Sequence, residues 1–253
     1  MKVTLIGSGN LATNLGHALR EAQVEILQIY SRTEANARRL ADELCVEAYT
    51  SQITNINCRS DVYIVAVKDD VLENVGRTLR EVLPDKLVVH TAGSMPMDVL
   101  TGEHRGVFYP MQTFSRQRIV PFAHIPLFLE ANREEDLKVL HRLAERLTDS
   151  IFELSSDDRK WLHIAAVFCC NFTNHMASLS AQLLESHNIP FRVMLPLMEE
   201  TIAKLHQLPP RRAQTGPAVR GDERVMQCHL QALKDEPEMA QIYEILSKSI
   251  QHD

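Results

Sequence analysis

The chain has 253 residues, of which 45% are hydrophobic and 24% charged, as in an ordinary soluble globular protein of one large or two modest domains. Its net charge of −6 and the lack of a Lys/Arg cluster interleaved with aromatic residues argue against a nucleic-acid partner. No apolar run is long enough to cross a membrane, and we expect neither a membrane partner nor a signal peptide, since the first strand begins at once. The five cysteines lack C-x-x-C spacing, which favours a reducing cytoplasm and predicts no metal site.

A glycine-rich turn follows the first predicted strand, residues 2–6. The turn reads Gly7-Ser8-Gly9-Asn10-Leu11-Ala12 and leads into a helical pattern. In such a G-x-G-x-x-A turn, Gly7 permits the sharp bend, Gly9 lets the backbone approach a pyrophosphate, and Ala12 allows close helix–strand packing. The first-turn amides and the helix dipole then face the phosphate. Glycines also serve ordinary turns, so the strand before and the helix after are what favour a dinucleotide site.

The end of the second predicted strand, residues 24–30, indicates which dinucleotide binds. An NAD site usually has Asp or Glu at this point, whereas this chain has Ser31-Arg32-Thr33 and no carboxylate before Glu34. Arg32 can pair with a 2′-phosphate while the two hydroxyls donate to its oxygens. Alternatively, Ser31 or Thr33 only caps the next helix, and both roles can hold together. We predict NADP(H) as the cofactor.

Strand-like and helix-like segments alternate through the first part of the chain. Strands are predicted near residues 2–6, 24–30, 47–49, 61–67, 86–91, 106–110, 125–130 and 151–153, and helices near 11–22, 34–44, 71–82 and 133–148. Strands separated by single helices indicate βαβ units and a mainly parallel sheet. The fold class is therefore α/β, with a Rossmann-like, doubly wound NADP-binding domain over residues 1–154.

The strand pattern disappears after residue 154. Helices are predicted near residues 157–186, 191–208, 223–234 and 237–251, so residues 155–253 form an all-helical substrate and dimerisation domain. Several of its residues together present more apolar surface than one small layer of helices can bury. This predicts a homodimer built through this domain. These residues are Phe168, Phe172, Met176, Leu195, Leu197 and Met198.

Several motifs carry a resemblance to known proteins. The turn 7–12, Ser31-Arg32-Thr33, Val65-Ala66-Val67-Lys68-Asp69 and His90-Thr91-Ala92-Gly93-Ser94 resemble pyrroline-5-carboxylate reductases, deazaflavin-dependent NADP oxidoreductases and 6-phosphogluconate-dehydrogenase-like β-hydroxyacid dehydrogenases. The resemblance implies NADP-dependent redox chemistry, a 6-phosphogluconate-dehydrogenase-like helical domain and a dimer. It also implies that the cofactor contacts Ala66, Val67, Lys68, Thr91, Ala92 and Gly93.

The second half looks closer still to one branch, which pairs a Rossmann-like domain with a helical domain of unknown function. The matching motifs are residues 109–114, 171–175 and 215–222. The resemblance covers nearly the whole chain, and it implies no substrate.

The predicted helix 157–186 has an unusual polar face. With 3.6 residues per turn, His163, Asn171, Asn174 and His175 share one arc with Lys160. Neutral hydrogen-bonding groups on an otherwise apolar helix suggest an enclosed polar cleft, although an ordinary helix contact with satisfied amides is the alternative. We predict Asn171 and His175 as catalytic and Asn174 as substrate-binding. The spacing from Lys160 to Asn171 is longer than in the hydroxyacid dehydrogenases, so their catalytic roles are not carried over.

Two further segments follow predicted strands. His90 ends its strand, and an imidazole of near-neutral pKa there can donate a proton to a carbonyl or imine as hydride arrives. The alternative is a capping residue that only shapes the loop. Gln112 and Thr113 follow the next strand and can orient a polar substrate, or they can bond only to backbone.

The loop 215–222 completes the predicted site. Arg220 can clamp a substrate carboxylate or phosphate, with Thr215 beside it, or it can pair only with Asp222. The consecutive glycines of pyrroline-5-carboxylate reductases are absent here, which disfavours a proline-pathway activity. We therefore predict an NADP(H)-dependent oxidoreductase for a small, anionic carbonyl or imine substrate, and the alternative is a non-catalytic NADP(H)-binding regulator.

Overall fold

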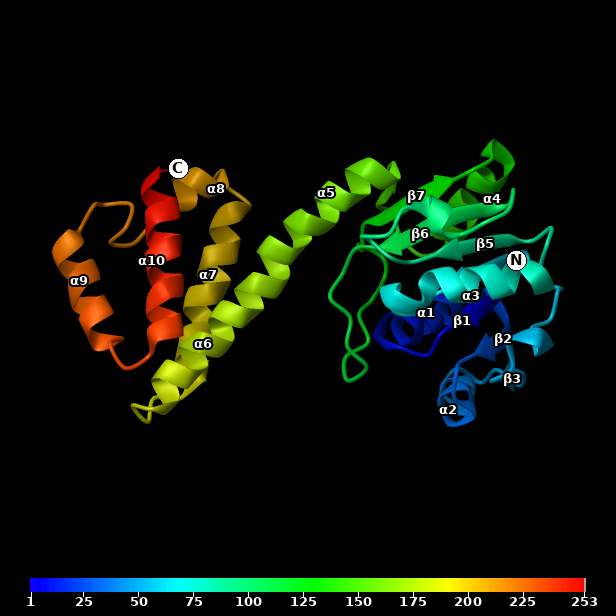
Figure 1. Cartoon of the computed structure of the whole chain (residues 1–253), viewed down its shortest axis with the longest axis horizontal. Coiled ribbons are helices and arrows are strands. Elements are labelled where there is room, and N and C mark those ends of the chain that lie inside the picture. Colours follow the sequence, from blue (N-terminus) through cyan, green and yellow to red (C-terminus); the bar gives the residue numbers. More distant parts are fainter. Residues whose placement is uncertain (253) are drawn as a thin grey trace. The chain divides into compact units, whose positions relative to one another are not determined.

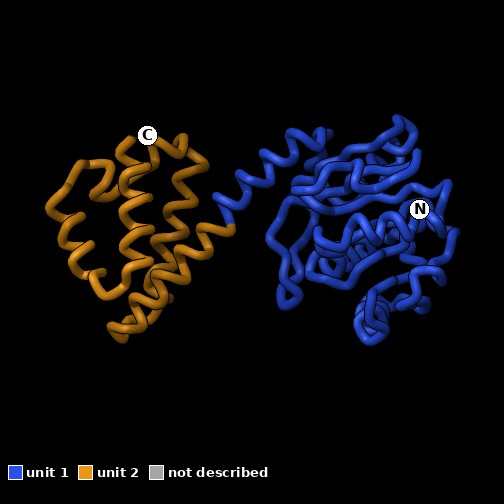
Figure 2. Tube along the Cα trace, in the orientation of Figure 1, with its two compact units in different colours: residues 1–170 blue, residues 171–253 orange. Residues whose placement is uncertain are grey.

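The computed structural model describes residues 1–252, and these separate into two compact units. The first unit is Met1–Cys170, and the second begins at Asn171 (Figure 2). Within the described residues, no helix combines the length and apolarity that a membrane crossing requires.

The first unit contains an eight-stranded sheet with helices on its two faces (Figure 1). The strands are β1 (Lys2–Ile6), β2 (Glu25–Tyr30), β3 (Tyr49–Thr50), β4 (Val62–Val65), β5 (Leu87–His90), β6 (Arg105–Pro110), β7 (Leu127–Ala131) and β8 (Ile151–Glu153). The helices are α1 (Asn10–Glu21), α2 (Glu34–Leu44), α3 (Asp69–Val82), α4 (Glu134–Ala144) and α5 (Ser156–Ala166).

The strand order is β3-β2-β1-β4-β5-β6-β7-β8, and all neighbours are parallel except β6 and β7. This confirms the predicted α/β fold with a mainly parallel, doubly wound sheet. The chain runs from β1 outward to β3 and then returns to the other side of β1 with β4. The order therefore reverses between β1 and β4, which is where open α/β sheets form a ligand crevice beyond their carboxyl ends.

The core explains why β4 is a continuous apolar run. Val62 and Ile64 pack into one cluster with leucines of α1, α2 and α4, whereas Tyr63 and Val65 pack into a second cluster with leucines of α3. Alternate residues of a strand point to opposite faces, so a central strand that is covered on both faces must be apolar at every position.

The second unit is helical, as predicted. It contains α6 (Thr173–Glu185), α7 (Leu195–Leu205), α8 (Pro210–Ala213), α9 (Glu223–Ala232) and α10 (Pro237–His252). Among its described residues, only Ala218 is buried. The unit therefore lacks a fully buried apolar core of its own.

The predicted regular helix over 157–186 needs a correction. Residues Val167–Phe172, between α5 and α6, are π-helical. A π turn closes its hydrogen bonds from i to i+5, so it changes the register of the side chains that follow it. Residues before and after this segment therefore do not share one face through a 3.6-residue period, and the single polar arc from Lys160 to His175 is wrong.

Candidate functional site

The turn after β1 leaves no room for a side chain at Gly7. The residue has a φ of +126°, and a Cβ there would lie 2.1 Å from the carbonyl oxygen of Ala66 after β4. The Gly7 amide donates to the Tyr30 carbonyl over 2.8 Å, and Ala12 of α1 is fully buried. Gly7 thus holds the ends of three neighbouring strands together, as a dinucleotide-binding turn requires.

Hydroxyls and guanidinium groups surround Ser8 in this turn. Its hydroxyl lies 2.7 Å from that of Ser31 at the end of β2. Its carbonyl oxygen accepts hydrogen bonds from Arg39 over 3.2 Å and from Arg116 over 2.8 Å. The two arginines add positive charge beside the helix terminus, which favours an anion there. Neither arginine was predicted from the sequence, because neither belongs to the turn motif.

A cavity of about 450 Å³ opens at the carboxyl ends of β1, β2 and β4. Nine of the predicted cofactor residues line it: Gly7, Ser8, Gly9, Ser31, Arg32, Thr33, Ala66, Val67 and Lys68. Tyr30, Asn36, Asp70, Val71, Asn74 and Val75 were not predicted and also line it. The last four follow the apolar strand β4 at the start of α3, a position from which the strand-end rule could have found them.

The cavity fits a phosphorylated nucleotide. It lies where the strand order reverses, and glycine backbone, hydroxyls and the cations Arg32 and Lys68 line it. At the end of β2, Ser31 stands where a ribose-binding carboxylate would stand in an NAD site.

The other predicted residues of the turn help to hold a distant segment. Asn10 donates to the Phe114 carbonyl over 3.2 Å, and the fully buried Asn14 donates to the Ser115 carbonyl over 3.0 Å. The Val120 amide in turn donates to Asn14. These hydrogen bonds hold the long connection between β6 and β7 against α1. Arg116 belongs to this connection and is thereby brought to the turn. Leu11, half-buried, packs against the core cluster beneath α1.

The remaining predicted cofactor residues form the loop after β5. The Thr91 amide donates to the Val65 carbonyl over 3.2 Å, which keeps this loop beside the end of β4. Ala92 and Gly93 follow, and Ser94 donates a hydrogen bond to Asp69 at the start of α3. The loop thus continues the line of strand ends beyond the cavity.

His90 departs from the expectation of a near-neutral imidazole. Its side chain is fully buried, and burial, reinforced by the charge of Arg159, lowers its pKa to about 4. The Ala92 amide donates to Nδ1 over 3.2 Å, so Nε2 carries the hydrogen and donates to the Pro96 carbonyl over 3.2 Å. Both ring nitrogens therefore bond to backbone of one loop. This geometry supports the alternative role, in which His90 shapes the loop.

The predicted substrate residues lie in both units. Gln112 and Thr113 are exposed, and the side-chain oxygen Oε1 of Gln112 accepts a hydrogen bond from the Thr113 backbone amide over 2.8 Å. In the second unit, Asn171, Asn174, His175, Thr215 and Arg220 are all exposed. Asp222 caps α9 by accepting from the Val225 amide over 3.2 Å. Recognition of substrate by these side chains stays a prediction.

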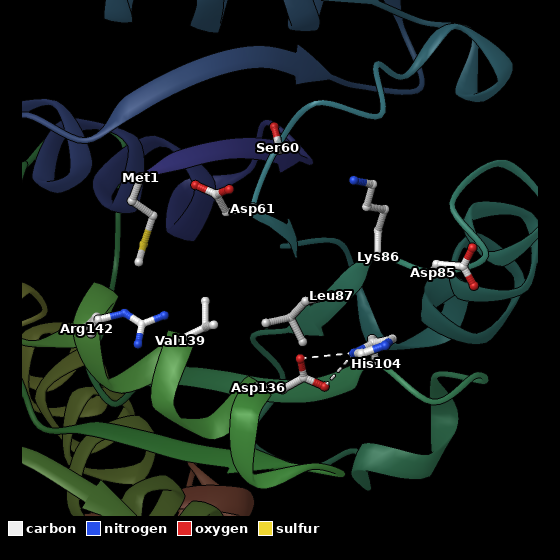
Figure 3. A pocket seen from close by; sticks show the side chains of 10 residues that line it. All are labelled: Met1, Ser60, Asp61, Asp85, Lys86, Leu87, His104, Asp136, Val139 and Arg142. Carbon is white, nitrogen blue, oxygen red and sulfur yellow. Dashed lines mark hydrogen bonds and ion pairs between the residues drawn. The ribbon is translucent and has the colours of Figure 1, made fainter.

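A second cavity, of about 560 Å³, lies on the side of the sheet where the parallel strands begin (Figure 3). It is lined by residues at or before the amino ends of β1, β4 and β5 and by residues of α4, including Met1, Asp61, Leu87 and Arg142. Figure 3 shows the carboxylate of Asp136 facing His104. Ligands of open α/β sheets bind at the carboxyl ends, so we assign the cofactor to the smaller cavity.

The buried imidazole of His90 makes a prediction for stability against pH. The pKa of His90 is about 4 in the folded chain and ordinarily 6.5. Between these pH values His90 binds a proton in the unfolded chain but not in the folded chain. The free energy of unfolding should therefore fall between pH 6.5 and pH 4, with His90 contributing about 3 kcal/mol. Urea unfolding across this range should show a smaller fall for His90→Gln.

A matched substitution at an exposed histidine serves as the control. The side chain of His124 is 89% exposed, and His124→Gln should keep the pH dependence of the starting protein. Equal slopes for the His90 variant and the starting protein would contradict the neutral, buried imidazole.

Two family descriptions match successive parts of the chain. An NADP oxidoreductase family, coenzyme F420-dependent, matches residues 2–93, and a domain of unknown function (DUF2520) matches residues 125–250. No curated protein matches the chain.

Solved structures resemble the whole chain. The structure of a putative NADP oxidoreductase from Bacteroides fragilis is 48% identical, with 100% of this chain and 98% of that chain covered and a TM-score of 0.94. A 1-pyrroline-5-carboxylate reductase from Streptococcus pyogenes is 15% identical, with 100% and 99% covered and a TM-score of 0.66. A variant imine reductase from Myxococcus stipitatus in complex with NAD+ is 18% identical, with 99% and 94% covered and a TM-score of 0.62.

The latter two likenesses show the fold, whereas the first covers nearly all of both chains at high identity. The predicted resemblance is confirmed: the chain belongs to the oxidoreductase family that joins an F420-dependent-type NADP oxidoreductase domain to a DUF2520 domain.

Proposed function

We propose that the protein is an NADP(H)-dependent oxidoreductase that reduces a small, anionic carbonyl or imine compound. The observation that carries this proposal is the crevice at the strand reversal, with the constricted Gly7 turn on one wall and Ser31, Arg32 and Thr33 on another. NADPH supplies a hydride when it is bound, and the protein supplies binding, orientation and a proton.

The choice of NADP(H) over NAD(H) follows from the chemistry at the end of β2. A guanidinium can pair with a phosphate in a bidentate manner, and the hydroxyls of Ser31 and Thr33 can donate to the same oxygens. The contact of Ser31 with Ser8 keeps one of these hydroxyls beside the glycine turn. The five cysteines are free thiols, and we place this activity in the reducing cytoplasm.

For the substrate, we propose recognition by amide, hydroxyl and guanidinium side chains. In the helical unit, Arg220 and Thr215 bind the anionic group, and Asn171, Asn174 and His175 orient the reacting centre. In the first unit, Gln112 and Thr113 are the candidates for binding a polar group. The chemistry of the side chains supports this set, because amides and a guanidinium recognise carboxylate and carbonyl oxygens. His90 holds the loop after β5 in this proposal and does not touch the substrate.

Cofactor preference tests the phosphate contact directly. The starting protein should bind NADPH more tightly than NADH, and Arg32→Ala should weaken NADPH binding by about 1–3 kcal/mol with little effect on NADH, because only NADPH carries the 2′-phosphate. Isothermal titration of both cofactors against both proteins measures the difference.

Arg38→Ala is the control for loss of one positive charge. Arg38 lies on α2, its side chain is 67% exposed, and it pairs with Asp42 on the same helix. This variant should keep the preference for NADPH. Equal affinities of the starting protein for NADPH and NADH would end the NADP assignment.

Turnover separates an enzyme from a regulator. We expect steady oxidation of NADPH, followed by its absorbance, with at least one member of a panel of 2-keto acids, aldehydes and cyclic imino acids. Tight NADPH binding without oxidation by any member of the panel would favour the non-catalytic regulator instead.

We also propose a homodimer formed by the helical unit. Its apolar side chains are exposed to an extent unusual for a stable helical layer: Leu197 is 60% exposed, Ile245 57% and Ile202 53%. Only one described residue of this unit is buried, so a covering surface is needed to remove these side chains from water. A second copy of the chain supplies the same apolar faces.

Light scattering tests the dimer. At roughly 10–50 μM, a range chosen from ordinary dimer affinities, the protein should have twice the chain mass of 28.7 kDa. Leu197→Asp combined with Ile245→Asp should give monomers, because the interface would bury unpaired carboxylates. Ile119→Asp, at an exposed isoleucine of the first unit, should leave the dimer intact. A starting protein that is purely monomeric would contradict the proposal.

A further inference from the structure

A tyrosine and a histidine meet beside the loop that follows β5. The hydroxyl oxygen of Tyr109 on β6 lies 3.3 Å from Nδ1 of His163 on α5. A Cβ on Gly93 would lie 2.6 Å from that Nδ1 and 2.9 Å from the hydroxyl. The Tyr109 and His163 side chains therefore occupy the space that a side chain at position 93 would fill, and they contact the loop backbone there. All three residues belong to the first unit.

The position of Gly93 relates the pair to the cofactor. The ribose phosphate site lies at the end of β2, and the pyrophosphate site lies at the turn after β1. A dinucleotide that extends onward along the strand ends passes β4 and reaches the loop after β5. The Thr91–Val65 hydrogen bond keeps that loop beside the end of β4. The pair thus lies on the nicotinamide side of the crevice.

The two side chains differ in their contact with solvent. Tyr109 is 8% exposed, whereas His163 is half-buried. Burial raises the pKa of the Tyr109 hydroxyl, while the nearby Arg159 charge opposes this and a Cys170 thiolate would add to it. The phenol therefore keeps its proton at neutral pH. The imidazole beside it can exchange protons with water through its other nitrogen.

We infer that Tyr109 is the proton donor of the reaction and that His163 resupplies its proton. The inference rests on the proposed reductase function and gives the proton step to groups outside the predicted set of His90, Asn171 and His175.

The proton balance is simple. When the carbon of a C=O or C=N bond gains a hydride, the π electron pair moves to the oxygen or nitrogen, which then needs one proton. Tyr109 gives its hydroxyl proton to that atom, and the phenolate takes the Nδ1 proton of His163. His163 takes a proton from solvent at Nε2, and proton exchange with solvent restores the Nδ1–H tautomer before the next turnover. In the reactive arrangement Nδ1–H donates to the Tyr109 oxygen, which leaves the phenol hydrogen free to point at the substrate.

The first experiment measures turnover with the best member of the 2-keto acid, aldehyde and imino acid panel. Tyr109→Phe should lower kcat roughly 100- to 10,000-fold, as expected for loss of a general acid. Its NADPH affinity by isothermal titration should stay within about twofold, because the hydroxyl contributes to chemistry and not to cofactor binding. His163→Asn keeps a hydrogen-bonding amide but cannot titrate, so it should flatten the pH profile of kcat.

A matched Tyr–His pair provides the control. In the helical unit, the Tyr243 hydroxyl lies 2.9 Å from Nδ1 of His229. Tyr243→Phe and His229→Asn remove the same groups outside the proposed site, and both variants should keep the kcat and pH profile of the starting protein.

The second experiment does not depend on turnover. With ¹⁵N-labelled histidine, the ring nitrogen resonances of His163, assigned by their loss in His163→Asn, should shift on addition of NADP+ and stay in place with 2′,5′-ADP. The second probe carries the 2′-phosphate but lacks the nicotinamide. A shift only with NADP+ places the pair at the nicotinamide end.

The outcomes separate the two proposals. Two results would overturn the proton-donor assignment without contradicting the reductase function. One is an unchanged kcat for Tyr109→Phe, and the other is His163 resonances that do not shift although NADP+ binds. Failure of the starting protein to bind NADP+ and NADPH would overturn both.

Discussion

The buried ion pair between Arg159 of α5 and Glu130 of β7 determines how the site is built. A guanidinium that is 1% exposed is costly to desolvate unless its charge is paired. Arg159 also donates to the Met95 carbonyl over 2.7 Å and to the Ser156 hydroxyl over 3.1 Å. The ion pair and the bond to Met95 therefore hold α5 against the sheet and the loop after β5. His163 lies one turn further along the same face of α5, and this placement brings it to Tyr109.

Arg159 of the same pair helps to explain why His163, and not His90, is assigned to the proton step. Arg159 stands near His90, and its charge together with full burial keeps that imidazole neutral and bonded only to backbone. A group without access to water cannot be reprotonated in each turnover, whereas a half-buried imidazole such as His163 can. His90 thus fixes the loop against which the Tyr109–His163 pair stands. The role of His90 at the end of β5 is therefore structural and not that of an acid.

Local patterns in the sequence were sufficient for the fold and for one wall of the crevice. The turn from Gly7 to Ala12 and the continuous apolar strand β4 each reflect constraints within a few neighbouring residues, so they can be read from the chain alone. The π-helical segment 167–172 could not be read in this way, because no residue type marks it. Long-range contacts leave no periodic signal either: Tyr109 and His163 are 54 residues apart, and Ser8 and Arg116 are 108 apart.

Strand β6 connects the two ends of the proposed site. Tyr109 stands near its carboxyl end at the loop after β5, and the connection that follows the strand returns to α1, where Arg116 reaches the Ser8 carbonyl. Asn14 is itself fully buried, and its hydrogen bonds to this connection help to hold the arginine at the phosphate turn. The proton donor and one cation of the phosphate site are therefore positioned by one strand and its connection. Reduction requires the nicotinamide and the proton donor to meet in one geometry, and a shared support limits their relative movement before the substrate arrives.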